Sequence, residues 1–70
     1  MQLQFNSLNP MLHDSIGDNY SYVIIDGGNG EFLTSTMKIG QFNDLNWLPP
    51  TYSLEEAKAE CQKWEDNPLF

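Results

Sequence analysis

The pattern of apolar and polar positions divides the chain into short extended segments followed by one helix. Apolar side chains alternate with glutamines over residues 1–5, which predicts a first short strand with one apolar face. Turn-forming Asn-Pro, Gly and Asp-Asn then occur within residues 6–19. We expect this second segment to be a loop, in which Met11, Leu12 and Ile16 either make one helical turn or close an edge of the core.

A β-hairpin with a glycine-rich turn is the clearest prediction. Residues 20–25 (YSYVII) are β-branched and aromatic, which is typical of a strand. Residues 26–30 (DGGNG) tolerate the positive φ angles of a tight reversal, and residues 31–37 (EFLTSTM) return as the partner strand. Both faces of this hairpin carry apolar side chains, so we expect a helix to cover one face and a loop to cover part of the other.

A proline-containing connection and a capped helix complete the chain. Within residues 40–52, Pro49 and Pro50 exclude a helix, and the large apolar side chains are expected to pack on the sheet. Those side chains belong to Phe42, Leu45, Trp47 and Leu48. Ser53 and Glu56 form a capping box, from which a helix is predicted to run to the Asn-Pro pair near the C-terminus.

The predicted helix is amphipathic. Its apolar residues recur at helical spacing on the face expected to contact the sheet, and they are Leu54, Ala57, Cys61 and Trp64. The opposite face carries Glu55, Glu56, Ala59, Glu60, Lys63 and Asp66. The predicted fold class is therefore α+β: a small antiparallel three-stranded sheet with one C-terminal helix packed on it (β-β-β-α), as a single domain over residues 1–70.

The composition is acidic, since ten carboxylates against three lysines and no arginine give a formal net charge of −7. Binding to nucleic acid or to an anionic membrane needs clustered Lys and Arg, so we expect neither. The lone Cys61 cannot form an internal disulfide, and the first residues show neither the basic region nor the apolar run of a signal peptide. The expectation is a cytoplasmic protein without a membrane segment.

Few side chains suit catalysis or metal binding. His13 and Asp14 are expected to be an exposed loop pair whose side chains point in different directions, with no catalytic role. Cys61 lies mid-helix on the apolar face, where burial keeps the thiol protonated and unreactive. In residues 26–31, glycines occupy positions where a calcium loop needs oxygen ligands. We therefore predict no enzyme activity, no metal and no cofactor.

The leading functional hypothesis is that the acidic surface binds a basic protein. This surface is taken to include all ten carboxylates, Glu65 among them. Acids on the helix and at the hairpin tip would pair with Lys or Arg of a partner that handles nucleic acid. The predicted contact residues are Glu55, Glu56, Glu60, Asp66, Glu31 and Asp26. The alternative explanation is that these acids only keep the protein soluble.

A second hypothesis is an apolar interaction surface, formed by the connection before the helix or by the sheet edge, that docks a partner or forms a homodimer. Its predicted contact residues are Trp47, Leu48, Pro49, Pro50 and Tyr52. Residues 49–52 also match P-P-x-Y, a pattern of extended proline ligands that bind the aromatic groove of WW domains. Alternatively, the prolines only stiffen the connection, and Tyr52 folds back as a hydrophobic staple.

Three segments resemble parts of small acidic accessory proteins that phages and mobile elements encode. They are YVIIDG at residues 22–27, GEF at residues 30–32 and YSLEEAKA at residues 52–59. Anti-CRISPR proteins and other host-takeover inhibitors belong to this group. The resemblance implies a non-enzymatic, stoichiometric inhibitor in the host cytoplasm, which acts as a partial nucleic-acid mimic on a basic, nucleic-acid-handling host protein.

Overall fold

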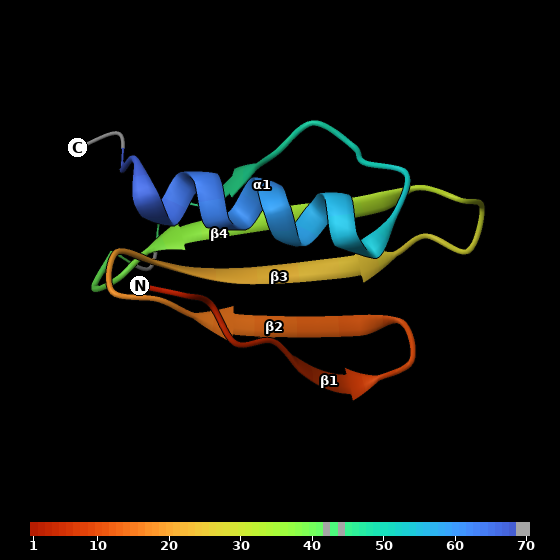
Figure 1. Ribbon diagram of the computed structural model, residues 1–70, viewed down its shortest axis with the longest axis horizontal. Coiled ribbons are helices and arrows are strands. Elements are labelled where there is room, and N and C mark those ends of the chain that lie inside the picture. The colour runs from red at the N-terminus through yellow and green to blue at the C-terminus, as the bar shows by residue number, and fades with distance from the viewer. Residues whose placement is uncertain (42, 44, 69–70) are drawn as a thin grey trace.

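The computed structural model, which describes residues 1–41, 43 and 45–68, is a five-stranded antiparallel sheet with one helix packed on it (Figure 1). Each strand pairs with its neighbour in sequence, in the order β1-β2-β3-β4-β5. The elements are β1 (Asn6–Asn9), β2 (Leu12–Ile16), β3 (Tyr20–Asp26), β4 (Phe32–Lys38), β5 (Leu45–Trp47) and α1 (Leu54–Asp66). The predicted α+β class is confirmed, but the prediction of three strands is wrong.

The predicted hairpin is confirmed and forms the centre of the sheet. Strands β3 and β4 pair along their whole length. In the turn between them, Gly28 and Gly30 have positive φ angles of 78° and 87°, which other residues rarely adopt. The backbone N–H groups of Gly28 and Glu31 donate hydrogen bonds to side-chain oxygens of Asp26 and Asn29, at 2.9 and 3.1 Å. The turn is therefore built from the residues that predicted it.

Two segments expected to be loops are strands. Residues 6–16 form a second hairpin, β1–β2, in place of the predicted loop or helical turn. All four residues of β1 are exposed, and the strand has only one neighbour, so its polar composition matches an edge strand as well as a loop. Strand β5 lies within the expected proline connection, where it pairs with β4.

The predicted strand at residues 1–5 is wrong, although two of its three alternating apolar side chains pack in the core as the alternation indicated. Leu3 is buried, and Phe5 packs against the core, whereas Met1 is exposed. The backbone N–H of Leu3 donates to Oε1 of Gln62 on α1 at 2.9 Å. The segment is therefore held by the helix and not by strand pairing.

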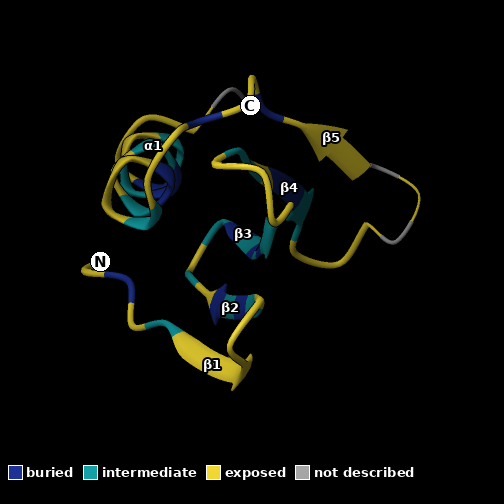
Figure 2. Cartoon of the chain, turned by 90° about the vertical axis from the view of Figure 1, so that its right-hand side faces the viewer, coloured by how far each residue is buried: buried dark blue, intermediate teal, exposed yellow. Residues whose placement is uncertain are grey.

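Helix α1 packs against β3 and β4 and buries one face of the sheet, which we call the covered face (Figure 2). The predicted apolar face of the helix is confirmed, since Ala57 and Cys61 are fully buried while Leu54 and Trp64 pack partly buried around them. The core consists of Leu3, Tyr20, Tyr22, Ile24, Ala57 and Cys61. The predicted N-cap is also confirmed, because Oγ of Ser53 accepts a hydrogen bond from a first-turn N–H at 3.0 Å. Among the residues whose structure is described, no helix has the length and apolar character needed to cross a membrane.

Candidate functional site

The second face of the sheet lies opposite α1, and we call it the open face (Figure 2). Side chains alternate between the two faces along each strand, and the pairing register aligns those of the open face in rows across the sheet. The open face consists of Leu12, Asp14, Ile16, Ser21, Val23, Ile25, Leu33, Ser35, Met37, Leu45 and Trp47. Apart from one carboxylate and two serines, these residues of β2 to β5 are apolar. Strand β1 adds the polar Asn6, which pairs with Asp14 at the edge of the sheet.

Large apolar side chains of the open face are exposed. The exposed fraction is 69% for Ile16, 58% for Trp47, 49% for Leu45 and 38% for Leu33. Single exposed apolar residues are common on soluble proteins, whereas contiguous patches mark sites of interaction. Here half-buried apolar residues lie in the same rows as the exposed ones, and they are Leu12, Val23, Ile25 and Met37. The open face is therefore a largely apolar surface, which Ser21 and Ser35 interrupt.

Asp14 is the acidic residue of this surface, and it lies within one of the rows. The register aligns it with Asn6, Val23, Ser35 and Trp47 across all five strands. Its Oδ1 atom is buried and has no hydrogen-bond partner among the described residues. A buried carboxylate oxygen without a donor is unfavourable. Asp14 as a whole is only half-buried, so a donor from outside can pair with the carboxylate once the side chain turns toward the surface.

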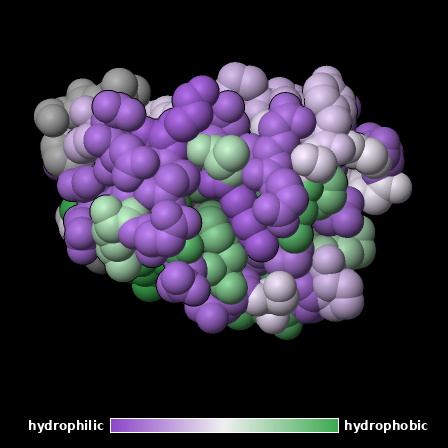
Figure 3. All heavy atoms as spheres, viewed as in Figure 1, coloured by the Kyte–Doolittle hydropathy of each residue, from purple (hydrophilic) through white to green (hydrophobic). Residues whose placement is uncertain are grey.

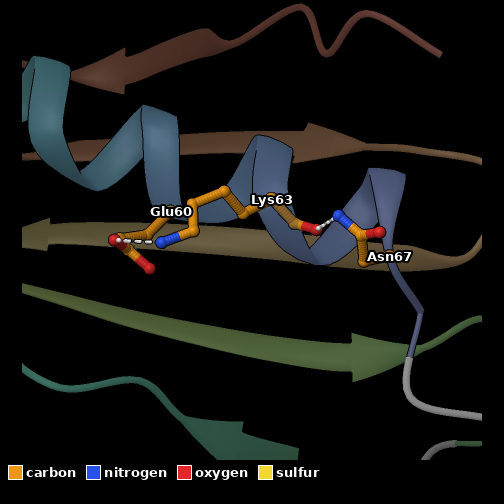
Figure 4. Close-up of polar contacts among 3 residues, drawn as sticks. All are labelled: Glu60, Lys63 and Asn67. Carbon is orange, nitrogen blue, oxygen red and sulfur yellow. Dashed lines mark hydrogen bonds and ion pairs between the residues drawn. The ribbon is translucent and has the colours of Figure 1, made fainter.

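The predicted acidic contact residues of the helix are accessible, but they do not form a purely acidic face. Glu55, Glu56 and Asp66 are exposed, and hydrophilic side chains cover much of this side of the molecule (Figure 3). Glu60 is half-buried, and its Oε1 atom lies 3.4 Å from Nζ of Lys63 (Figure 4). This ion pair partly neutralises the middle of the predicted acidic surface.

The acids at the hairpin tip are less accessible than expected. Asp26 and Glu31 are both half-buried, and the Asp26 carboxylate accepts a hydrogen bond from the turn backbone. The turn between β3 and β4 lies at the same end of the molecule as the start of α1, where Glu55 and Glu56 are located (Figure 1). Asp66 lies at the other end of α1, so the six predicted acids do not form one cluster.

Glu65 is a core residue and not part of the acidic surface, contrary to the sequence-based count. Its carboxylate accepts hydrogen bonds from the N–H of Asp18 at 2.7 Å, the N–H of Asn19 at 3.2 Å and the hydroxyl of Tyr22 at 2.9 Å. Burial, together with the adjacent carboxylate, raises the pKa of Tyr22 well above its usual range. Glu65 thus ties the last turn of α1 to the β2–β3 turn.

The apolar residues of the connection are split between the surface and the core. Leu45 and Trp47 were expected to pack on the sheet, but both are exposed on β5. Leu48, another predicted partner contact, is buried, which leaves little of its side chain accessible to a partner. Its N–H donates to the carbonyl of Thr34 at 2.9 Å, which continues the pairing beyond β5. Phe42 lies outside the described residues.

The P-P-x-Y segment is displayed at the surface, except for its third residue. Pro49, Pro50 and Tyr52 are exposed, so the prediction that Tyr52 folds back as a staple is wrong. Thr51 is buried and exchanges two backbone hydrogen bonds with Phe32, at 2.7 and 3.0 Å. The exposed prolines and Tyr52 are accessible, as binding to an aromatic groove would require, and both interpretations of the prolines remain predictions.

His13 and Asp14 are consecutive residues of β2, so the expectation of an exposed loop pair is wrong. Their side chains point to opposite faces, because they are neighbours on a strand. His13 is buried, and its Nδ1 atom is hydrogen-bonded to Oγ of Ser7 on β1 at 2.8 Å. A serine beside a histidine suits nucleophilic catalysis only when a third group orients the imidazole. The Asp14 carboxylate lies across the sheet from that ring, and the Ser7–His13 contact instead joins β1 to β2.

Cys61 is buried in the core as predicted, and burial raises the pKa of its thiol to about 12. A thiol with such a pKa stays protonated at neutral pH and is a poor nucleophile. Within the described part of the chain, no group of three or more His, Cys, Asp or Glu side chains is placed to hold a metal ion.

Comparison with known proteins gives no relative of the chain. No protein-family model, curated protein or solved structure matches it. Its function is therefore argued from the contacts, burial and charge of its own residues, and the open face is the surface they distinguish most clearly.

Proposed function

We propose that this protein is a non-enzymatic protein-binding module and that its binding surface is the open face of the sheet. The observation that carries the proposal is the exposure of four large apolar residues on one face of the sheet, Ile16, Leu33, Leu45 and Trp47. Their exposed parts amount to roughly 400 Å², about half of the ~800 Å² that each partner contributes to a standard protein interface. The half-buried residues between them supply further contact area.

The magnitude of this apolar surface is appropriate for reversible recognition. Removing roughly 400 Å² from water contributes about 10 kcal/mol at 25 cal/mol per Å². Association itself costs about 4–15 kcal/mol in lost freedom of motion, so the exposed side chains alone offset a large part of that cost. Polar contacts and the surrounding residues then determine how tightly a partner binds and which partner it is.

A second candidate function is favoured by the exposure of Glu55, Glu56 and Asp66 on α1. These acids would bind a basic, nucleic-acid-handling protein by charge, as an inhibitor of the type that the sequence resemblance implies. The Glu60–Lys63 ion pair interrupts that surface. Helix α1 and the open face lie on opposite sides of the sheet, so substitutions separate the two candidates (Figure 2).

The test is quantitative capture of proteins from an extract of the producing cells by three forms of the full chain. The forms are wild type, an open-face variant with Ile16→Ser and Trp47→Ser, and a helix variant with Glu55→Lys and Glu56→Lys. Because all four positions are exposed, both variants should fold, which circular dichroism and urea unfolding will check.

We expect proteins captured by the wild type to be retained by the helix variant and lost from the open-face variant. The reverse result, with capture lost only when the helix charges are reversed, would support the second candidate and contradict the proposed function.

A further inference from the structure

Among the residues that the structure describes, the open face combines a largely apolar surface with one carboxylate, and this combination selects a class of partner. We propose that its occupant is a protein surface that presents one Lys or Arg, surrounded by apolar side chains, to Asp14. The inference rests on the proposed function and specifies the partner that the same surface binds.

The first support is the unsatisfied Asp14 oxygen. Oδ1 is buried without a hydrogen-bond donor from the described residues, although Asp14 pairs with Asn6 and Val23 on either side. Because the residue as a whole is half-buried, a partner can reach the carboxylate when the side chain turns toward the surface. A guanidinium or ammonium group is the donor that pairs most strongly with a carboxylate, since the hydrogen bond is charge-assisted. A partner that covers the whole row from Asp14 to Trp47 would also exclude water from the pair, which strengthens the attraction between the two charges.

The second support is the placement of the cations. Lys58 and Lys63 belong to α1, on the other side of the sheet, and Lys38 pairs with Tyr20 in a covered-face row at the end of β4. Of the residues assigned to the open face, none is basic. The cation that Asp14 lacks must therefore come from the partner.

The same argument disfavours a second copy of the chain as the occupant. A self-paired open face would bring in a second Asp14 and no cation, which leaves two carboxylates buried and uncompensated. Each copy also carries a net charge of −7, so the long-range field opposes self-association. That field attracts a basic partner, so charge guides the encounter while the apolar residues and Asp14 determine the fit.

The experiment is a selection of random peptides, displayed on phage, against the immobilised full chain. Binders of the wild type should contain a Lys or Arg flanked by apolar residues. We expect their affinity to fall at least tenfold for Asp14→Asn and for Trp47→Ser. Replacing the basic residue of the peptide by Gln should lower its affinity for the wild type by a similar factor. The Gln peptide should bind the Asp14→Asn variant no more weakly than either change alone allows, because both changes remove the same ion pair. Asp14→Asn keeps the shape of the side chain, and urea unfolding will confirm that the variant is folded.

The outcomes separate this inference from the proposed function. Binders that depend on Trp47 but not on Asp14, or that lack a basic residue, would overturn the inference and leave the proposed function standing. Binders insensitive to both substitutions, or no binder at micromolar concentration, would overturn both. Sedimentation equilibrium is the companion measurement: a wild-type dimer that Trp47→Ser dissociates would make a second copy the occupant and overturn the inference alone.

Discussion

The covered face and the open face of the sheet differ in where each places polar and aliphatic side chains. Beneath α1 and the N-terminal segment, the covered face includes Ser15, Thr34 and Thr36, all almost completely buried. The open face instead exposes Ile16 and Trp47. An antiparallel sheet that packs on one side usually has the opposite arrangement, with polar residues toward solvent. This difference indicates that the open face is a surface to be covered, and that stability and recognition depend on opposite sides of one sheet.

The largest expected effect is a difference in stability between two matched substitutions, one on each face of the sheet. Ile24→Ala, at a fully buried position beneath α1, should lower the free energy of unfolding by about 2–5 kcal/mol, because it leaves a cavity. Ile16→Ala, on the open face, should lower it by less than about 0.5 kcal/mol. Urea unfolding followed by tryptophan fluorescence measures both. Equal losses would show that the open face is part of the folding core.

A slightly smaller effect is expected where α1 is tied to the sheet. Glu65→Gln should cost about 2–3 kcal/mol of unfolding free energy, since the carboxylate accepts hydrogen bonds from Asp18, Asn19 and Tyr22 in a buried site. The matched control is Glu55→Gln on the exposed side of the same helix, which should change stability by less than about 0.5 kcal/mol. The same unfolding assay measures both, and a neutral Glu65→Gln variant would contradict the anchoring role.

Alkaline pH should lower the stability of the protein through two groups buried at the covered face, Tyr22 and Cys61. Burial raises the pKa of Tyr22 and of Cys61 in the folded state, so the folded protein keeps protons that the unfolded chain releases. Stability should be complete below about pH 9 and fall above it, by about 1.4 kcal/mol per pH unit for each group that the unfolded chain deprotonates. For Cys61 the loss should end near pH 12.

Urea unfolding of the reduced protein between pH 7 and pH 11 measures this slope. Tyr22→Phe removes the hydroxyl and should flatten the decline above pH 10. A free energy of unfolding that stays constant from pH 9 to pH 11 would contradict the burial of these two groups.

The smallest expected effect on stability comes from a substitution on the open face. Trp47→Ser should change the free energy of unfolding by less than about 0.5 kcal/mol, because more than half of the side chain is exposed. It should nevertheless reduce the binding of a hydrophobic fluorescent dye, for which Tyr52→Ser at another exposed aromatic residue is the control. If dye binding falls equally in both variants, the open face binds hydrophobic molecules no better than other exposed parts of the surface.

The elements that the sequence predicted correctly are those that turn and cap residues specify locally. The hairpin of β3 and β4 follows from its DGGNG turn and β-branched flanks, and α1 follows from its Ser53 cap and apolar spacing. The β1–β2 hairpin was missed because edge strands tolerate the polar residues that also mark loops.

Contacts that depend on tertiary structure carried little sequence signal. Glu65 resembles its exposed helical neighbours until α1 is docked beside Tyr22, and the Ser7–His13 pair exists only in the register of β1 and β2. The open face was partly foreseen, because apolar residues occupied both faces of the predicted hairpin. Its extent required the additional strands β2 and β5, which contribute Asp14 and Trp47.

The measurement that tests the central claim most directly is nuclear magnetic resonance mapping of a selected ligand on the isotope-labelled full chain. If the open face is the binding surface, amide shifts will concentrate in β2 to β5 around Asp14, Val23, Ser35 and Trp47, and the exposed side of α1 will stay unchanged. Shifts centred on Glu55, Glu56 and Asp66, with the open face unaffected, would contradict the account.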